Sequence, residues 1–412
     1  MPILMGVNAM NVKECNLKVT SQYSFCCNPL SMDLYSGCTH RCKYCFAYSF
    51  HKTASCRTNS AEFDFDNATI CKYDKFLKKI KPGYVYNSSL VDHLIKNRQP
   101  LHIGGMADPF PLGVEEHFKH TYKFLKQVGD YPLIISTKNP MYPELIGERN
   151  VILQCSIIGF GDIFRKIEPG VLSGEERIEK LKAFKGKAKK IVIRMQPFMP
   201  WLYTEKTLEE FVSKCASVCD ALTVEFLHLQ GNYNKDLDKA LGICAIDKIK
   251  SNGEFKGNEA HFSDEYMLKY ILLIRDLCHK HGIEFYSAEN SLRNYGDSIN
   301  CCGLCKNNVG FESKNDRNTG RLFELGVDRI KVDDFLKTVD SKLYSRWRLG
   351  DSDNSSLNCT NARKYSISNL YTVWDDYVKK LKSNNPLNPA VLYRDVKIKN
   401  IDGELWFIIN RE

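Results

Sequence analysis

Short β-branched stretches alternate with amphipathic helical patterns through most of the chain before residue 290, and this alternation limits the folds open to it. The β-branched stretches are predicted strands, and several of the segments between them carry apolar residues at helical spacing. The predicted strands are 31–36, 101–103, 132–136, 151–156, 191–195, 222–227 and 283–287. Repeated strand–helix units imply a parallel sheet, and six or seven of them imply an open or closed barrel. We therefore predict an α/β protein built on a partial (β/α)6 barrel of the TIM type.

Several of the predicted helices carry end signals in the sequence. Ser173 and Glu176 form a capping box ahead of one helical pattern. Ser263 is placed to open another, which Gly282 would end. These signals place helices between the predicted strands.

The alternation fades after the last predicted strand, which suggests a division of the chain. We expect an N-terminal segment at 1–30, the barrel at 31–290 and a smaller C-terminal α+β extension at 291–412. The extension should contain a hairpin around Asp402 and Gly403, a pair typical of tight hairpin turns. We expect it to cover the mouth of the barrel or one side of it.

Composition narrows the class of protein further. No apolar run approaches the roughly 18 residues of a membrane helix, and residues 1–6 are too short for a secretory signal, so we expect a cytoplasmic protein with no membrane partner. The 58 Lys and Arg against 49 Asp and Glu give a net charge of +9, which permits a nucleic-acid partner without requiring one. The chain has 17 cysteines, and a reducing compartment would not keep them as a disulfide framework. A tight cysteine cluster is therefore better explained by metal binding or thiol chemistry.

Three cysteines follow the first predicted strand at the spacing C-x3-C-x2-C: Cys38, Cys42 and Cys45. Three thiolates on one short loop can hold three irons of a [4Fe–4S] cube, and the fourth iron is then free for a substrate or cofactor. Zinc is the alternative, but it usually takes four ligands in two close pairs, and no second pair lies at a suitable spacing. The spacing favours the cluster.

This motif, with the aromatic Tyr44 before its last cysteine, resembles the signature of the radical S-adenosylmethionine (radical SAM) enzymes. The resemblance implies that the fourth iron chelates S-adenosyl-L-methionine. An electron from a reductant such as flavodoxin or ferredoxin, passed through the cluster, would then cleave this cofactor to a 5′-deoxyadenosyl radical that abstracts hydrogen. It also implies that Tyr44 lies near the adenine, although packing of the loop is an equally good explanation for this residue.

Residues 31 to 200 carry a nearer resemblance, to the spore photoproduct lyase family of DNA-repair enzymes. The similar segments follow successive predicted strands: 35–48, 104–110, 135–139, 165–169 and 175–179. By this resemblance, the residues near the cofactor are Gly104, Gly105, Asp108, Lys138, Ser156 and Arg194. Two of them have structural alternatives: a turn cap before Pro109 for Asp108, and an ion pair with Glu168 for Arg194.

One position departs from that family. A cysteine that returns a hydrogen atom to the product radical precedes the Ser/Thr-Asp pair of the second-strand motif, and here the slot holds Met106. A thioether has no S–H bond to give. The resemblance therefore supports the broad family rather than reversal of a thymine photoproduct by the same route.

A second group of cysteines, Cys301, Cys302 and Cys305, follows the last predicted strand, which would place it at the barrel mouth. The group has three possible roles. It could bind an auxiliary cluster or zinc with a fourth ligand such as Cys359 or Cys278. One thiol could be the hydrogen donor that Met106 cannot be, or the three could pack the C-terminal region. We expect the segment to face the radical site and to act in turnover.

The leading hypothesis is a radical SAM enzyme that abstracts hydrogen from a nucleic acid or nucleotide. Radical modification of a peptide or small metabolite is a second possibility, because the substrates of this superfamily vary more than its fold. A non-catalytic iron–sulfur sensing or binding module is a third. A pure sensor would not need the ordered strand-end residues Gly104, Lys138 and Ser156.

Overall fold

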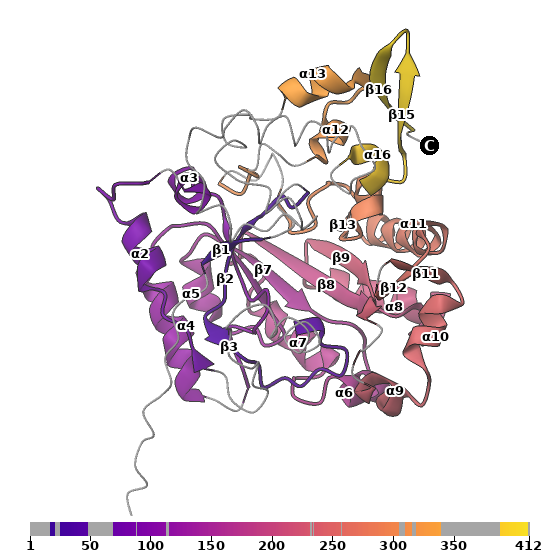
Figure 1. Ribbon diagram of the computed structural model, residues 1–412. Coiled ribbons are helices and arrows are strands. Elements are labelled where there is room, and N and C mark those ends of the chain that lie inside the picture. Colours follow the sequence, from indigo (N-terminus) through magenta and orange to yellow (C-terminus); the bar gives the residue numbers. More distant parts are fainter. Residues whose placement is uncertain are drawn as a thin grey trace, which may run out of the picture.

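The computed structural model describes residues 17–20, 25–47, 69–87, 89–112, 115–230, 233, 235–256, 258–304, 310–314, 319–338 and 388–410. An eight-stranded sheet forms the centre of the molecule, in the order β1-β2-β5-β6-β7-β8-β9-β13 (Figure 1). Neighbouring strands pair in parallel except at the edge, where β1 is antiparallel to β2. The strands are β1 Lys18–Val19, β2 Leu30–Met32, β5 Leu101–Ile103, β6 Leu133–Thr137, β7 Val151–Ser156, β8 Lys190–Phe198, β9 Ala221–Phe226 and β13 Glu284–Ser287.

Helices connect the parallel strands and lie outside the sheet. In Figure 1, α2, α4 and α5 cover the early strands, while α8 and α11 lie beside the late ones. The connecting helices are α2 Asp74–Ile80, α3 Leu90–Lys96, α4 Glu115–Gln127, α5 Pro143–Gly147, α6 Asp162–Ile167, α7 Gly174–Lys182, α8 Glu205–Ala216, α9 Asp236–Leu241, α10 Ala245–Lys250 and α11 Asp264–Lys280. Short 3-10 helices follow two of the strands, η1 at Pro200–Leu202 and η2 at Asn290–Tyr295. The predicted partial (β/α)6 barrel is confirmed.

The predicted helix ends are also confirmed. Ser173 accepts from the backbone N–H of Glu176 and forms a full capping box with it at the start of α7. Ser263 accepts from the backbone N–H of Tyr266 at the start of α11. Gly282 then takes a left-handed φ of +72° two residues after that helix ends.

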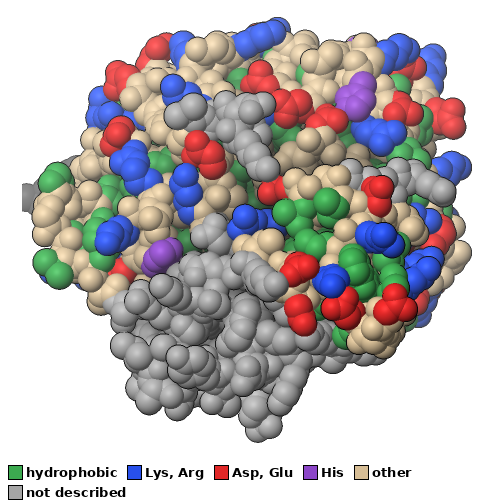
Figure 2. Space-filling view, turned by 90° about the horizontal axis from the view of Figure 1, so that it is seen from above, with side chains coloured by type: hydrophobic (Ala, Val, Ile, Leu, Met, Phe, Trp, Pro, Cys, Tyr) green, Lys and Arg blue, Asp and Glu red, His purple; other side chains and the backbone are tan. Residues whose placement is uncertain are grey.

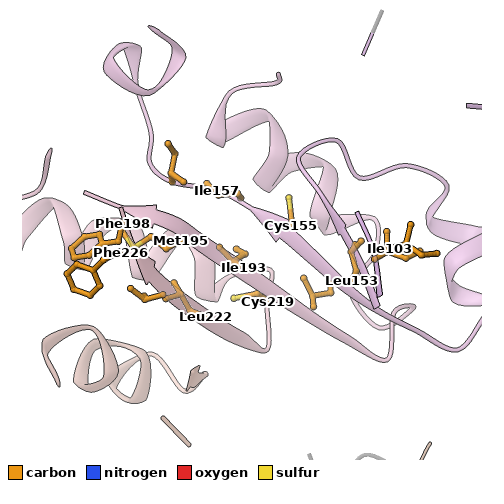
Figure 3. Close-up of a cluster of buried hydrophobic side chains, with 14 of the residues drawn as sticks. Ile103, Leu153, Cys155, Ile157, Ile193, Met195, Phe198, Cys219, Leu222 and Phe226 are labelled. Atoms are coloured by element: carbon orange, nitrogen blue, oxygen red, sulfur yellow. The ribbon is translucent and has the colours of Figure 1, made fainter. Parts of the chain in front are cut away.

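The two faces of the sheet have different partners. One face packs against the helices and forms the main core, which includes Leu153, Cys155 and Ile193 (Figure 3). The opposite face contains Ile134, Ile152 and Val192 in a second, smaller core inside the barrel. Since successive side chains of a strand point to opposite faces, Gln154 and Ser156 share the inner face with Ile152.

The first predicted strand is split in two. β2 ends at Met32, and β3 (Tyr35–Ser36) leaves the large sheet to pair with β4 (Thr69–Ile70). The carboxylate of Asp33 lies between them and accepts from the backbone N–H groups of Met106 and Ala107, at 3.0 and 3.4 Å. This polar contact turns the chain away from the sheet just before the cysteine motif.

A three-stranded insertion and the C-terminal extension complete the described structure. β10 (Leu229–Gln230), β12 (Glu259–Phe262) and β11 (Gly253–Lys256) form a small sheet next to β9. The extension contains α12 Arg321–Glu324, β14 Arg329–Lys331, α13 Val332–Lys337, α16 Pro389–Leu392, β15 Val396–Ile401 and β16 Glu404–Ile409. Asp402 and Gly403, both at positive φ, make the predicted hairpin turn between β15 and β16.

One part of the extension lies beside the barrel rather than over its mouth, and the prediction allowed either position. Ser313 donates to the carbonyl of Cys27 at 2.7 Å, and the backbone N–H of Lys314 donates to Gln99 at 2.8 Å. Gln99 comes just before β5, so residues 310–314 lie at the amino-terminal end of the barrel rather than over its mouth. Residues 339–387 lie outside the described ranges.

Candidate functional site

The loop with Cys38, Cys42 and Cys45 follows β3 and is anchored to the connection between α6 and α7. The backbone N–H of Lys43 donates to Ile167 at 2.9 Å, and that of Gly170 donates to His40 at 3.1 Å. A Cβ at Gly170 would lie 2.5 Å from the His40 carbonyl oxygen, so only glycine allows this approach. The sequence similarity around residues 165–169 therefore marks the segment on which the cysteine loop rests.

The three thiols are close enough to interact electrostatically: Cys45 raises the pKa of Cys38, and both raise the pKa of Cys42. Burial, followed by the nearby Asp108 carboxylate, raises the pKa of Cys38 to about 12, while the backbone N–H groups of Asp108 and His40 oppose this by hydrogen bonding to its sulfur. Burial also raises the pKa of Cys42. A bound cation would reverse this preference, because coordination deprotonates a thiol. The donor set is therefore suited to iron or another soft metal.

Among the described residues, no three His, Cys, Asp or Glu side chains converge as ligands of one metal ion. In a [4Fe–4S] cube each thiolate binds a different iron.

A buried ionic network lies beside the cysteine loop and includes Lys138. Its ammonium group is 2.8 Å from Glu168 Oε1 and 2.8 Å from the Tyr44 hydroxyl. Glu168 also accepts from Tyr44 and from Arg177, which in turn donates to the carbonyl of Ser156. Burial alone would raise the pKa of Glu168, but the charges of Arg177 and Lys138 hold it at about 2. The network brings together three of the predicted residues: Tyr44, Lys138 and Ser156.

Asp108 connects the second- and third-strand segments. Its carboxylate accepts from the Thr137 hydroxyl at 2.7 Å and from the backbone N–H groups of Phe110 and Lys138 at 2.9 and 2.6 Å. His40 Nδ1 lies 3.5 Å from the same carboxylate. The side chain is thus engaged by protein groups on both oxygens, and it positions Lys138.

The two predicted glycines have different surroundings. Gly104 has φ +88°, and a Cβ there would lie 2.0 Å from the Ser136 carbonyl oxygen. Gly105 is open, because the nearest atom to its Cβ would be a ring carbon of His102 at 3.9 Å. The close approach of β6 therefore explains why residue 104 is a glycine, whereas the open space at Gly105 leaves room for a ligand.

A polar layer crosses the inside of the barrel at the level of Arg194. Arg194 donates to Gln154 Oε1 at 2.9 Å, and Gln154 also accepts from the Ser136 hydroxyl at 2.6 Å. His102 Nε2 is 2.7 Å from the same hydroxyl. On the other side of Arg194, Gln196 contacts both Arg194 and Glu225. The acidic neighbour of Arg194 is Glu225, at 3.9 Å, so the predicted alternative of an ion pair with Glu168 is wrong.

Two buried polar atoms of this layer have no hydrogen-bond partner in the described residues: Gln154 Nε2 and Arg194 Nε. Unpaired buried donors are costly, and in proteins they commonly face a ligand or water. This layer is therefore suited to binding a polar substrate.

Glu225 and a pair of histidines lie at the carboxyl end of β9. Burial and the charge of Glu289 raise the pKa of Glu225 to about 7. His228 and His261 face each other through their Nδ1 atoms at 2.6 Å, and His228 Nε2 is 3.4 Å from Glu289. The carboxylate of Glu289 also accepts from the backbone N–H of Phe226 at 2.6 Å.

His102, Gln154 and Glu225 were not among the predicted site residues. The sequence did contain a pattern that could have identified them, because polar residues at alternate positions of apolar strands point to the same face. Gln154 precedes Ser156 by two residues, and Thr223 precedes Glu225 by two. The polar residues at every second position of the buried strands would therefore have predicted this inner layer.

Cys301 and Cys302 are not at the mouth of the barrel, and for these two cysteines the prediction is wrong. A Cβ at Gly303 would lie 2.9 Å from Val192 and 3.5 Å from Ile152, both near the amino-terminal ends of their strands. The Thr223 hydroxyl donates to the carbonyl of Cys301 at 2.9 Å. Cys301 and Cys302 therefore form part of the barrel floor.

The fourth ligands suggested for this group need revision. Cys278 is buried near Cys215 and Cys219, at the opposite face of the sheet, and is not close to Cys301. The neighbours of Cys301 and Cys302 are instead Cys26 and Cys27. Cys305 and Cys359 lie outside the described residues.

The described surface carries side chains of both charges. On the face in Figure 2, basic and acidic side chains of the described residues are interspersed. No helix in the described ranges combines the length and the apolar character that a membrane span requires.

The sequence matches no protein-family model and none of the curated proteins. Solved structures of spore photoproduct lyase are similar in fold. A cysteine-to-serine variant aligns with a TM-score of 0.50 and 16% identity over 67% of this chain and 82% of that chain. A cysteine-to-alanine variant gives 0.50 and 14% over 67% and 81%. A double variant with bound AdoMet and dinucleoside spore photoproduct gives 0.49 and 15% over 67% and 80%. The two alignments at a TM-score of 0.50 support the fold.

Proposed function

We propose that this chain is a radical SAM enzyme resembling the spore photoproduct lyases, with residues 31–290 as its catalytic domain. The observation that carries the proposal is the anchoring of the Cys38–Cys45 loop to the segments whose sequences resemble that family. Gly170 supports the loop from one side, and Tyr44 joins it to Lys138 and Glu168 on the other. A loop that served only as a sensor would not need these connections to the strand ends.

Cys38, Cys42 and Cys45 would hold a [4Fe–4S] cluster, and Gly105 would leave space for S-adenosylmethionine beside it. When bound, the cluster and cofactor supply a one-electron reductive cleavage that ends in removal of a hydrogen atom from the substrate. Tyr44 and Lys138, fixed by Glu168, would orient the cofactor, and Gln154 and Arg194 would donate to acceptor atoms of the substrate. We propose a nucleic acid or nucleotide as that substrate, since the fold neighbours are spore photoproduct lyases and the chain carries +9 net charge.

The hydrogen donor is a separate part of the proposal. Met106 has no S–H bond. Cys301 lies at the floor of the barrel, close enough to Arg194 and Glu225 to interact electrostatically with both. We propose that the adjacent Cys302, whose raised pKa keeps its thiol protonated, gives its hydrogen atom to the product radical: an S–H bond breaks, a C–H bond forms, and a thiyl remains. Cys301 and Cys305 would support this role from the same segment.

Anaerobic reconstitution tests the assignment of the cluster. The wild-type chain should bind about four irons at this site and release 5′-deoxyadenosine on reduction, and Cys38→Ala, Cys42→Ala and Cys45→Ala together should abolish both. Retention of iron and of cofactor cleavage in the triple variant would refute the proposal. Binding to single- and double-stranded DNA across a salt series tests the substrate class, because phosphate contacts make affinity fall steeply with salt.

A further inference from the structure

Four cysteines from opposite ends of the barrel sequence meet at its floor. Cys26 and Cys27 precede β2, whereas Cys301 and Cys302 follow η2. The sulfurs of Cys301 and Cys302 are 3.8 Å apart. Cys27 and Cys302 belong to one buried cluster, and Cys301 packs against it. The thiols of Cys26, Cys301 and Cys302 all raise the pKa of Cys27, which places Cys27 at the centre of the group.

The two segments are fixed independently of the sulfurs. Ser313 holds the carbonyl of Cys27 at 2.7 Å, and Gln99 Nε2 lies 3.5 Å from it. Thr223 holds the carbonyl of Cys301 at 2.9 Å. The contact between the thiols is therefore a product of the fold rather than of a mobile loop.

A buried arginine lies over this group. Arg293 is only 4% exposed; it donates to the carbonyl of Phe25, and its guanidinium carbon is 5.8 Å from the centre of the Phe25 ring. Its largest electrostatic partners are the thiols of Cys301, Cys27 and Cys26. A guanidinium stays charged in proteins, and a buried charge requires a nearby anion. The groups placed to supply that anion are the cysteines.

Cys301 is the cysteine best placed to be the thiolate. Hydrogen bonds from the thiols of Cys27 and Cys302 lower its pKa, and Arg293 and Arg194 add to this, against the opposing effect of burial. Cys301 and Cys26 are partly exposed, whereas Cys27 and Cys302 are buried. A reagent could therefore reach Cys301 before Cys27 or Cys302.

We propose that Cys301 is a reactive thiolate and that Cys27 is its disulfide partner, so that the barrel floor contains a redox modification site. Cys27 contacts Cys301 from another segment, whereas a bond to the adjacent Cys302 would strain the intervening peptide. The inference does not depend on the proposed function, because it concerns thiol chemistry of the protein alone.

The reaction is thiol–disulfide exchange with a small-molecule disulfide, RSSR. The Cys301 thiolate attacks one sulfur of RSSR, so that a mixed disulfide forms and RS⁻ leaves. Cys27 then loses its proton and attacks the Cys301 sulfur, which releases the second RS⁻. The two cysteines lose two electrons in total, and RSSR is reduced to two thiols.

The disulfide is tested directly in the full-length wild-type protein. After anaerobic incubation with oxidised glutathione, peptide mass spectrometry under non-reducing conditions should find Cys27 joined to Cys301, and dithiothreitol should reverse the link. Cys302→Ser should retain this bond, and Cys301→Ser should lose it. Absence of the Cys27–Cys301 link, or a link between Cys301 and Cys302 in its place, would overturn the proposal.

The thiolate is tested by its rate of alkylation. Iodoacetamide at pH 6 should label Cys301 at least tenfold faster than the exposed Cys244 in the same chain, since the thiolate is the reacting form. Arg293→Met should reduce that advantage. An equal or slower rate at Cys301 in the wild type would contradict the assignment. A zinc or iron content that falls in both Cys27→Ser and Cys301→Ser would show a metal site and would also overturn it.

Discussion

Lys138 and Glu168 form a buried ion pair, with 2.8 Å between Nζ and Oε1, and this pair connects the end of β6 to the segment that supports the cysteine loop. Glu168 is 1% exposed and pairs with Arg177 on its other oxygen. One carboxylate thus compensates two buried cations. The network therefore affects both the stability of the fold and the position of the loop.

Replacing Glu168 by Gln should strongly destabilise the protein. Removing one partner of a buried pair leaves the remaining charge uncompensated, and this costs roughly 3–5 kcal/mol. Glu179→Gln is the matched control, because Glu179 pairs with Lys182 on the surface and such pairs contribute about 1 kcal/mol or less. Urea unfolding of the two variants makes the comparison. Equal losses would show that Arg177 and Lys138 do not depend on Glu168.

Replacement by alanine should change the stability of the protein at Gly104 but not at the adjacent Gly105. Gly104→Ala should destabilise the protein by at least about 1–3 kcal/mol, because alanine is strained at positive φ and its Cβ would meet the Ser136 carbonyl at 2.0 Å. Gly105→Ala has space and should fold normally. If Gly105 lies beside the cofactor, its alanine variant should bind S-adenosylmethionine more weakly in calorimetry of the reconstituted protein. Similar melting temperatures for the two variants would argue against the packing of Gly104.

The order of strands and helices was predictable from local patterns, whereas contacts between distant segments were not. Ser173 and Ser263 cap their helices as expected, because capping involves residues only three apart. Asp33 splits the first strand through contacts with Met106 and Ala107, and no local pattern shows that.

The location of Cys301 shows the same limit. The order of the chain suggested the mouth of the barrel, but the backbone N–H of Asp297 donates to Phe285 at 2.8 Å. The segment after η2 therefore returns along β13 toward the floor. The encounter of Cys27 with Cys301 depends on this reversal, so the four-cysteine group had no signal in the sequence.

Gly170→Ala should lower the amount of iron bound per chain, although it changes none of the proposed ligands. The added Cβ would lie 2.5 Å from the carbonyl oxygen of His40 and 2.7 Å from that of Thr39, both backbone atoms of the cysteine loop. The loop must move away, and we expect at least a twofold loss of iron per chain after reconstitution and gel filtration. Gly147→Ala is the control, because its Cβ would mainly contact the flexible side chain of Lys187. Full iron content in Gly170→Ala would mean that this support is dispensable.

Glu225 should make the stability of the protein depend on pH between about 4.5 and 7. Burial, followed by the charge of Glu289, raises its pKa in the folded state to about 7 from the ordinary 4.5. Below pH 4.5 the carboxyl group is protonated in both states. As the pH rises from 4.5 to 7, the unfolded chain releases this proton while the folded protein keeps it, so the contribution to stability is lost.

Glu225→Gln should remove that dependence, because glutamine stays neutral. Relative to the variant, the wild type should lose up to about 3 kcal/mol between pH 4.5 and 8, since one pKa unit corresponds to about 1.4 kcal/mol. Glu289→Gln provides a contrast of opposite sign. Burial alone would raise the pKa of Glu289, but the charge of His228 and the hydrogen bonds from His228 and the backbone N–H of Phe226 together lower it, so the ionised form stabilises the fold above its ordinary pKa. At pH 8, thermal unfolding should therefore show Glu225→Gln above the wild type and Glu289→Gln below it. If both variants fall below the wild type, the ionised Glu225 stabilises the fold and its pKa is not raised.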